Sequence, residues 1–394
     1  MLTSVIFSVK IISRNQIGSA VKNLYDKDEI IELRKRLHAF PELSGREIKT
    51  AAFIDKYIRN KTGFKTYNID GSLIAVYSPD SERREPIAFR AELDAVPVEE
   101  VGGLSYASKN PGAAHKCGHD GHMAALLAFM LSTAADKPKR KIYFIFQKAE
   151  ETGEGAKSLG EYIKKSDISE IYAFHNIPGY PAGTCLFKDG CFACASCGLR
   201  IELIGKTNHA AFPGQKYSPA RTVGRLIASL DALAEKAGGG RLIDYTATGI
   251  DLNFISCGVA PGGCELNLTL RAEYEDDLNM FIDLIKAAAA EFAAEDEIGI
   301  ETSILDPFPE TVNSGECIQT LKAALERCGV PSIELGEPMR WSEDFGHYTK
   351  LIPGAIFGIG SGESCPALHT PEYDFPDEII DVAVKIFKEI AGID

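Results

Sequence analysis

Two apolar runs, Pro86-Ile-Ala-Phe-Arg-Ala-Glu-Leu93 and Lys141-Ile-Tyr-Phe-Ile-Phe-Gln147, decide the fold class of this 394-residue sequence. Neither run alternates apolar with polar residues, so each is expected to be a strand buried on both faces. Between them, a run rich in alanine and leucine predicts a helix that begins near His122. Strand, helix and strand in this order are typical of a parallel α/β sheet, which places ligands at the carboxyl ends of its strands. The chemistry of the chain is therefore expected where these strands end.

The same architecture extends toward both ends of the chain. Residues 26–40 carry apolar side chains at helical spacing, and Ser44 with Glu47 forms a capping-box pattern ahead of a second helix. Residues 354–360 are typical of another buried strand, and residues 377–391 of an amphipathic terminal helix. The sequence thus predicts an α/β fold with a mixed, mostly parallel sheet flanked by helices.

A different pattern occupies the middle of the chain. Two runs alternate apolar with polar residues, as half-exposed antiparallel strands do, and two helical stretches separate and follow them: residues 199–203, 266–274, 218–236 and 277–294. We expect an inserted α+β domain at residues 196–304, within a discontinuous larger domain formed by residues 1–195 and 305–394. The chain also exceeds the size at which one hydrophobic core usually keeps growing, which favours two domains.

The composition excludes several classes of protein. A formal charge of -14 and a pI near 5.2 disfavour nucleic acid or an anionic membrane as partner, because like charges repel. No run reaches the roughly 20 apolar residues of a membrane-spanning helix, and Lys10 interrupts the apolar amino terminus, so we expect no signal peptide. Ten cysteines without the spacing of a disulfide framework favour a reducing compartment, and we expect a cytoplasmic location.

The stretch His115-Lys-Cys117-Gly-His119-Asp120-Gly-His122 is dense in metal-binding and acid-base side chains. In an extended segment, the side chains of His115, Cys117 and His119 point to one side and could converge. A thiolate beside an imidazole at a strand-to-helix turn suits either a divalent metal such as zinc or a cysteine nucleophile. The motif alone leaves both alternatives open.

A pair of carboxylates follows the second of the two strands, in Phe146-Gln-Lys-Ala-Glu150-Glu151-Thr-Gly. Neighbouring side chains of a strand point to opposite faces, so both can serve one site only where the backbone turns, which Thr152-Gly153 allows. One carboxylate could then bind a cation while the other exchanges protons with a water molecule. Acidic pairs in loops are usually only solvated, but this pair reaches the same sheet edge as Cys117.

Further histidines fall at predicted strand ends. His175 ends the apolar stretch Ile171-Tyr-Ala-Phe-His, and His369 lies in the motif Ala-Leu-His-Thr-Pro. Either one alone would more often be a hydrogen-bonded core or loop residue, yet a doubly wound sheet gathers its strand ends in one crevice. The combined set exceeds what one catalytic zinc with an open position needs, so two metals that share a ligand fit better: Cys117, His119, Glu151, His175 and His369.

Three other features are less specific. Asp94 follows the first strand and could orient a ligand, although a turn aspartate before a proline is equally expected there. His209 lies on a predicted turn of the insert, where an exposed histidine is the default and a substrate contact is the alternative. A cysteine triplet lacks a fourth ligand for an iron-sulfur or zinc site, so we interpret its members as small buried apolar residues: Cys191, Cys194 and Cys197.

Seven motifs, in order along the chain, resemble those of the N-acyl-amino-acid amidohydrolases. They are His38-Ala-Phe-Pro-Glu-Leu-Ser, Arg90-Ala-Glu-Leu-Asp-Ala-Val-Pro, His115-Lys-Cys-Gly-His-Asp-Gly-His, Phe146-Gln-Lys-Ala-Glu-Glu, Gly205-Lys-Thr-Asn-His-Ala-Ala-Phe-Pro, Ser342-Glu-Asp-Phe and Leu368-His-Thr-Pro. This branch of the dimetal aminoacylase and carboxypeptidase metallopeptidase family includes hippurate hydrolases and the plant indoleacetyl-amino-acid hydrolases. The resemblance spans nearly the whole chain, and the Cys-Gly-His-Asp element is specific to this branch.

The resemblance implies a role for each matched residue. Glu150 would be the general base and acid, and Cys117 would bridge two metals whose coordination is completed by the remaining ligands: His119, Glu151, His175 and His369. The fold would be a metal-binding α/β domain with an inserted α+β lid that also forms a homodimer interface. His209 matches a lid histidine that stabilises the tetrahedral intermediate, often across the dimer. Zinc or manganese suits these ligands, with nickel or cobalt as further options.

The sequence departs from the family pattern at three positions. Lys148 stands where proline is usual, and a cation so close to Glu150 could lower the pKa of that carboxyl. Gly214 replaces a frequent histidine, and Gly258 replaces an asparagine expected to help at the lid. These departures affect the substrate assignment and leave the predicted metal ligands intact.

We therefore predict metal-dependent hydrolysis of an amide bond in an N-acyl amino acid or a small dipeptide-like substrate, with Glu150 as general base and acid. A first alternative is a dipeptidase or aminopeptidase of the same family. A second uses Cys117 as a nucleophile paired with His119, and predicts sensitivity to thiol alkylation but not to chelators. A third is an inactive homologue kept for binding, which the complete ligand set disfavours.

Overall fold

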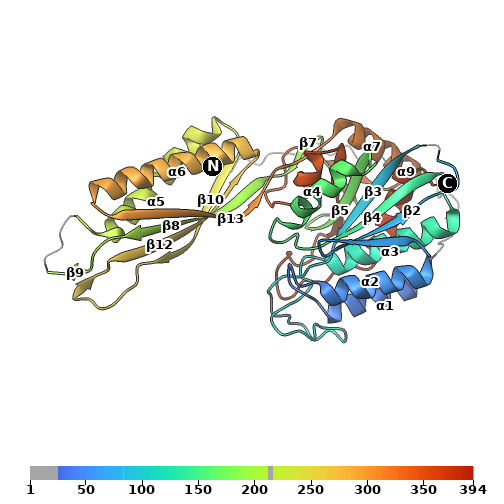
Figure 1. The fold of residues 1–394 in the computed structure, drawn as a ribbon, viewed down its shortest axis with the longest axis horizontal. Helices are drawn as coiled ribbons and strands as arrows, with labels where there is room; N and C mark the ends of the chain where they lie inside the picture. Colours follow the sequence, from blue (N-terminus) through green and yellow to red (C-terminus); the bar gives the residue numbers. More distant parts are fainter. Residues whose placement is uncertain (1–24, 83, 212–215, 394) are drawn as a thin grey trace.

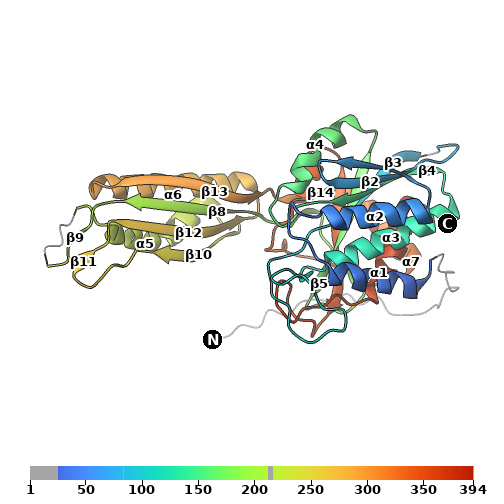
Figure 2. The ribbon, with the colours of Figure 1, turned by 60° about the horizontal axis from the view of Figure 1, so that its bottom comes forward.

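The computed structural model describes residues 25–82, 84–211 and 216–393. The apolar amino terminus with Lys10, and Gly214 in the insert, lie outside the described residues. The described residues form two parts that lie end to end in an elongated molecule (Figure 1, Figure 2).

The larger part is built on an eight-stranded mixed sheet. In sheet order its strands are β1 (Lys65–Ile69), β2 (Ser72–Tyr77), β4 (Arg140–Gln147), β3 (Arg84–Glu92), β5 (Glu170–Pro178), β16 (Gly354–Gly362), β6 (Cys185–Phe187) and β15 (Ser332–Glu334). The four neighbours β4, β3, β5 and β16 run parallel to one another. The two apolar runs of the sequence are β3 and β4, which are buried over most of their length because helices cover both faces.

Helices cover the two faces of this sheet unequally. One face carries α2 (Ile48–Lys61), α3 (His119–Asp136), α7 (Gly315–Cys328) and α9 (Ile379–Ala391), and α1 (Lys27–Ala39) packs on α3. The other face carries α4 (Gly155–Lys165) and the short α8 (Gly346–Thr349). A two-stranded sheet of β7 (Gly190–Ala193) and β14 (Thr311–Asn313) lies beside them. This architecture confirms the predicted α/β class with a mixed, mostly parallel sheet.

The smaller part is a four-stranded antiparallel sheet with two long helices (Figure 1). Its strands are β10 (Ile243–Asp251), β12 (Gly263–Ala272), β8 (Ala195–Ile204) and β13 (Gly299–Phe308), and its helices are α5 (Pro219–Gly238) and α6 (Glu275–Glu295). Alternate residues of β12 are buried, as the alternating sequence predicts for a sheet with one face covered. At the outer end, β9 (Asn208–His209) pairs with β11 (Val259–Ala260).

The capping box expected before α2 is wrong. Helix α2 begins at Ile48, and the side chain of Glu47 makes no cap hydrogen bond to it. Instead, Glu47 Oε1 accepts from the backbone N–H of Ala149 at 2.7 Å, and Ser44 Oγ donates to Asp94 Oδ2 at 2.8 Å. Both side chains therefore hold loops at the carboxyl ends of β3 and β4, which the local sequence pattern could not reveal.

The cysteine triplet is buried, as the sequence predicts. All ten cysteines lie in the described part of the chain and are free thiols, and the triplet Cys191, Cys194 and Cys197 is buried at the junction of the two parts. Among the described helices, none combines the length and the apolar character that crossing a membrane requires.

We propose that the insert is a separate domain, close to the boundaries expected at residues 196 and 304. Its apolar cluster is built from its own strands and helices, and the two clusters of the larger part contain no residue of the insert. The two chain crossings are adjacent, because Ser196 pairs with Phe308.

Replacing residues 196–304 with a short Gly-Ser linker should therefore leave a larger part that still folds. The expected result is a single cooperative thermal transition, followed by circular dichroism, because its own core remains complete. The isolated insert is the matched second sample and should melt cooperatively too. Loss of the transition in the linked protein would contradict the proposed boundaries.

Candidate metal centre

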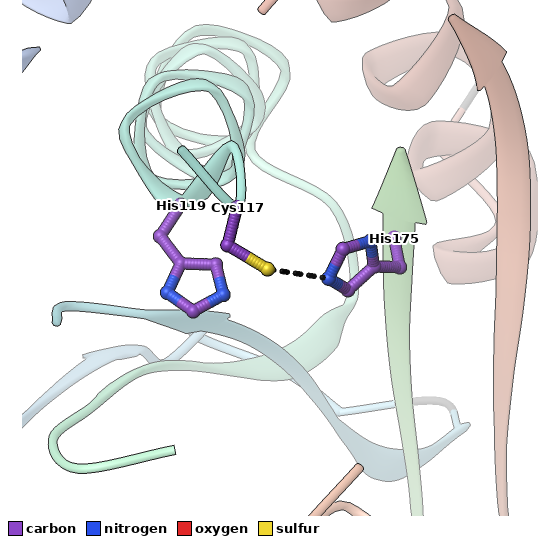
Figure 3. Close-up of side chains that lie close together, drawn as sticks. All are labelled: Cys117, His119 and His175. Carbon is purple, nitrogen blue, oxygen red and sulfur yellow. Dashed lines mark hydrogen bonds between the residues drawn. The ribbon is translucent and has the colours of Figure 1, made fainter. Parts of the chain in front are cut away.

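The predicted site residues gather at the carboxyl ends of the parallel strands. Asp94 follows β3, the pair Glu150 and Glu151 follows β4, and His175 lies in the last part of β5. His119 is the first residue of α3, which brings the Cys-Gly-His motif to the same edge (Figure 3). The sheet topology therefore assembles residues that are far apart in the sequence.

A tight turn at Gly118 separates Cys117 from His119, the two residues of the motif that face the centre. Its backbone has φ +96°, and a Cβ there would lie on the amide of the Asn176 side chain, so only glycine fits. This turn ends the extended alternation expected from His115 to His119. His115 does not join the group: its ring lies 6.4 Å from that of His38, and neither ring nitrogen has a hydrogen-bond partner among the described residues.

Cys117, His119 and His175 form the first candidate ligand group. The Sγ atom of Cys117 lies 3.5 Å from Nε2 of His175 (Figure 3). The Nδ1 atom of His119 lies 2.9 Å from the backbone oxygen of Asp94, and Nδ1 of His175 lies 2.9 Å from that of Asn176. Because a carbonyl only accepts, each Nδ1 donates a hydrogen to it, which leaves Nε2 of each ring as the nitrogen that a cation would bind.

Glu150, Glu151 and His369 complete the centre from two loops. Glu151 Oε1 lies 3.4 Å from Nε2 of His369 and 3.8 Å from Nε2 of His119, and Glu150 Oε2 lies 3.9 Å from the latter atom. The turn that brings both carboxylates to one site begins earlier than expected, at Ala149 with φ +49°. His369 also has a left-handed backbone, so the loops are held in uncommon conformations at the site.

The donor atoms fit a pair of cations. Cys117 belongs to two candidate groups, one with His119 and His175 and one with Glu151 and His369. Within the described residues, the buried atoms His119 Nε2 and Glu151 Oε1 have no hydrogen-bond partner, which is costly for buried polar atoms. A thiol, imidazoles and a carboxylate are the ligands of a borderline-soft divalent metal. Two cations that share Cys117 would use all of these atoms.

The pKa values at the centre reflect an excess of negative charge. Burial and the neighbouring carboxylates, Glu343 first, raise the pKa of Glu150 well above its usual value. Burial, then Glu151 and Glu150, do the same to the pKa of the Cys117 thiol. Burial lowers the pKa of His119, but Glu92 and other carboxylates outweigh it and raise that pKa to about 10. Bound divalent cations would offset this charge.

A buried ion-pair network beside Glu150 was missed in the sequence. Arg90 is fully buried and pairs with Glu92, and it lies 2.7 Å from both Glu343 and Asp344. The backbone N–H of Asp344 donates to Glu150 Oε1 at 3.4 Å, so the network positions that carboxylate. Removing one partner of such a pair typically costs about 3–5 kcal/mol. The sequence does contain a signal for this network, because Arg90 and Glu92 are charged residues inside a strand expected to be buried on both faces, and buried charges require partners.

A second network supports the other side of the centre. His122 lies between Glu92 and Asn176, with Nδ1 2.7 Å from the carboxylate and Nε2 2.6 Å from the amide oxygen. Asp120 Oδ2 lies 2.8 Å from Nδ1 of His38. Asp120 and His122 therefore lie in a hydrogen-bonded shell around the centre, and His38, for which the sequence indicated no role, belongs to the same shell.

The effect expected of Lys148 on Glu150 is wrong. The Lys148 ammonium lies 2.8 Å from a carboxylate oxygen of Asp70, at the edge of the sheet. The pKa of Glu150 is raised and not lowered, and the cation beside it is Arg90. The Lys148 side chain, which stands where the family usually has proline, is therefore directed away from the centre.

His209 does not join the other predicted site residues in this chain. Strand β9, which contains it, lies at the outer end of the insert in both views (Figure 1, Figure 2). Gly258 is next to it, because its backbone oxygen accepts from the N–H of Ala210 at 2.9 Å. The departure at Gly258 therefore affects the same outer end of the insert as His209.

Comparison with known sequences is consistent with this geometry. The sequence pattern of peptidase family M20/M25/M40 matches residues 88–392. An N-acetyldiaminopimelate deacetylase of Ligilactobacillus salivarius is 29% identical over 368 residues, which cover 89% of this chain and 93% of that protein. An N-acetyl-L-cysteine deacetylase of Bacillus subtilis is 31% identical over 341 residues, which cover 84% and 80%.

Solved structures share the fold as well. A dinuclear metal-binding peptidase of family M20 from Bacillus subtilis superposes with a TM-score of 0.78 at 26% identity, covering 93% of this chain and 97% of that chain. A tripeptidase from Staphylococcus aureus has the same fold, with a TM-score of 0.74 at 16% identity over 94% and 99% of the two chains. The chain is a hydrolase that belongs to peptidase family M20/M25/M40.

Proposed function

We propose that this protein hydrolyses the amide bond of N-acyl amino acids at a centre of two divalent cations. One observation carries the proposal: two candidate ligand groups share Cys117, and the buried carboxyl of Glu150 lies beside them. The sequence relatives named as deacetylases of N-acetylated amino acids support the same reaction class. Among the metals that these ligands suit, zinc or manganese is proposed first, with nickel or cobalt as further options.

The cations would be held by side chains from two strand ends, from the start of α3 and from one loop. Cys117 would bridge them, and the other ligands would complete the two coordination shells: His119, Glu151, His175 and His369. Asp94 would keep His119 oriented, because its backbone oxygen accepts from Nδ1 of that ring. Its carboxylate would hold the loop of Glu151, whose backbone N–H donates to it at 3.0 Å. When bound, two such cations lower the pKa of a water molecule and polarise the substrate carbonyl.

Glu150 would carry the proton in both halves of the reaction. Its carboxylate takes a proton from the attacking water and passes it to the leaving nitrogen. The N–H of Asp344 and the Arg90 network fix the position of Glu150, and burial keeps it away from bulk solvent. General acid-base catalysis of this kind is worth roughly 100- to 10,000-fold in rate.

The alternative in which Cys117 is a nucleophile receives less support. A nucleophilic cysteine needs a lowered pKa, whereas burial and the carboxylates of Glu151 and Glu150 raise the pKa of Cys117. That alternative would also leave Glu151 and His369 without a function. The ten free thiols agree with the expected cytoplasmic location, which we retain as a proposal.

We further propose that two copies of the chain form a homodimer through the insert. The insert exposes several large apolar side chains, including Ile250, Phe254 and Ile255, and β10 is an unpaired edge of its sheet. Because β9 lies far from the centre of its own chain, His209 would act at the centre of the second copy. There it would stabilise the developing oxyanion.

The first test is hydrolysis of a panel of N-acyl amino acids and dipeptides, with metal content measured on the same sample. We expect turnover of N-acyl amino acids, loss of turnover after chelation, and recovery when zinc or manganese is added back. Preference for dipeptides would favour the dipeptidase alternative, and hydrolysis by chelator-treated protein, free of metal, would contradict the proposed centre.

Glu150→Gln is the matched variant in this test, because it keeps the size of the side chain and removes its base. It should lose at least roughly 100-fold in kcat while binding the same amount of metal. Glu161→Gln is the control, since that carboxylate is exposed on α4 and its replacement should leave kcat unchanged. A Glu150→Gln protein with wild-type kcat would contradict the assigned role.

The second test mixes two inactive variants. His209→Ala should lose roughly 100- to 1,000-fold in kcat, as expected for one oxyanion donor. Refolding it together with Glu150→Gln should restore roughly a quarter of wild-type activity, because half of the C2 dimers are mixed and each has one complete site.

Each variant refolded alone is the control for this mixing test. Restored activity in the mixture requires that His209 acts across the dimer. A mixture as inactive as its components, or a chain that sediments as a monomer at full activity, would contradict the dimer and the role of His209.

A further inference from the structure

Trp341 is the only tryptophan of the chain, and it lies beside the candidate centre without a role in the reaction proposed above. Its ring centroid is 5.2 Å from that of His175, with the two planes at 42°. His175 in turn lies 3.5 Å from the Sγ atom of Cys117. One side chain therefore separates the indole from the residue that the two ligand groups share.

The backbone on both sides of Trp341 is fixed. Two residues before it, the N–H of Met339 donates to the backbone oxygen of Phe192 at 2.7 Å. Three residues after it, the N–H of Asp344 donates to Glu150 Oε1 at 3.4 Å. The segment thus runs from β7 to the proposed general base, and its backbone is anchored on both sides of Trp341.

The indole places apolar surface next to a group of polar side chains. It packs edge-on against the buried ring of Phe192, with centroids 5.9 Å apart and planes at 78°. Trp341 itself is only half-buried, so part of the ring remains accessible. The groups around the shared cysteine are carboxylates and imidazoles, and small-molecule sites typically combine a few such polar groups with an apolar wall.

We propose that Trp341 forms the wall of a subsite for an apolar substituent next to the scissile amide, and that it limits the size of this substituent. The inference rests on the proposed function, because it requires an amide substrate at the centre. Two substituents flank such an amide, the acyl group and the amino-acid side chain. Either substituent can be apolar, so the experiment varies the acyl group and the amino-acid side chain separately.

The test compares wild type with Trp341→Ala on two substrate series. One series varies the acyl group on alanine from acetyl through butyryl to benzoyl, and the other varies the side chain of N-acetyl amino acids from alanine through leucine to phenylalanine. In one series, Trp341→Ala should raise kcat/KM for the bulkiest member relative to the smallest by roughly 10-fold or more. The series that responds identifies the substituent that contacts the indole.

Trp341→Phe should give an intermediate preference, because it retains part of the wall. Tyr67→Ala is the matched aromatic control: Tyr67 is half-exposed on the edge strand β1, and β2 and β4 separate β1 from β3. It should leave both preferences unchanged. A uniform fall of kcat/KM in both series for Trp341→Ala, with no change in preference, would overturn the proposal and leave Trp341 as a packing residue.

Fluorescence gives a readout that does not depend on turnover. Co²⁺ should quench the emission of Trp341 as it binds to metal-free protein, whereas Zn²⁺, a d¹⁰ ion, should not. Quenching without hydrolysis of any N-acyl amino acid would support the location of Trp341 and reject the proposed function. Activity restored by Co²⁺ without quenching would support the function and overturn the inference about Trp341.

Discussion

The burial of negative charge at one edge of the sheet is the constraint on which the rest of this structure depends. Glu92, Glu150, Glu343 and Asp344 are buried together, and each uncompensated buried charge costs several kcal/mol. The guanidinium of Arg90 offsets part of this charge through its pairs with Glu92, Glu343 and Asp344. Burial, followed by the neighbouring carboxylates, raises the pKa values of Glu150 and Cys117. Burial lowers the pKa of His119, but Glu92 and other carboxylates outweigh it, and cations at the shared cysteine would offset this negative charge.

The fold supplies this edge with residues that point in fixed directions. Backbone carbonyls hold Nδ1 of His119 and His175, so both Nε2 atoms face the centre. The glycine turn at Gly118 and the left-handed residues Ala149 and His369 are uncommon backbone conformations, and all three adjoin or form the site. Rigid strands and strained turns together hold the donor atoms near one another, which favours tight binding of cations.

The sequence predicted the mostly parallel sheet, the antiparallel strands in the middle of the chain and the meeting of the candidate ligands at one sheet edge, because these follow from local periodicity and from the rule that strand ends meet. It did not reveal interactions whose partners are remote. Ser44 and Glu47 matched a capping box, yet their side chains bind Asp94 and Ala149, which only the tertiary fold brings near. Lys148 was expected to affect Glu150 by proximity in sequence, but its partner is Asp70. Arg90 could have been recognised as part of a site, since a charged residue in a buried strand requires partners.

The feature that defines the proposed centre is a pair of cations that share Cys117. It is tested most directly by a crystal structure of the metal-loaded protein, with anomalous scattering collected at the absorption edge of the metal. If two cations share Cys117, two anomalous peaks per chain are expected. Both should contact the Sγ atom of Cys117, one near His119 or His175 and the other near Glu151 or His369. A single peak, or two peaks that Cys117 does not contact, would contradict this arrangement.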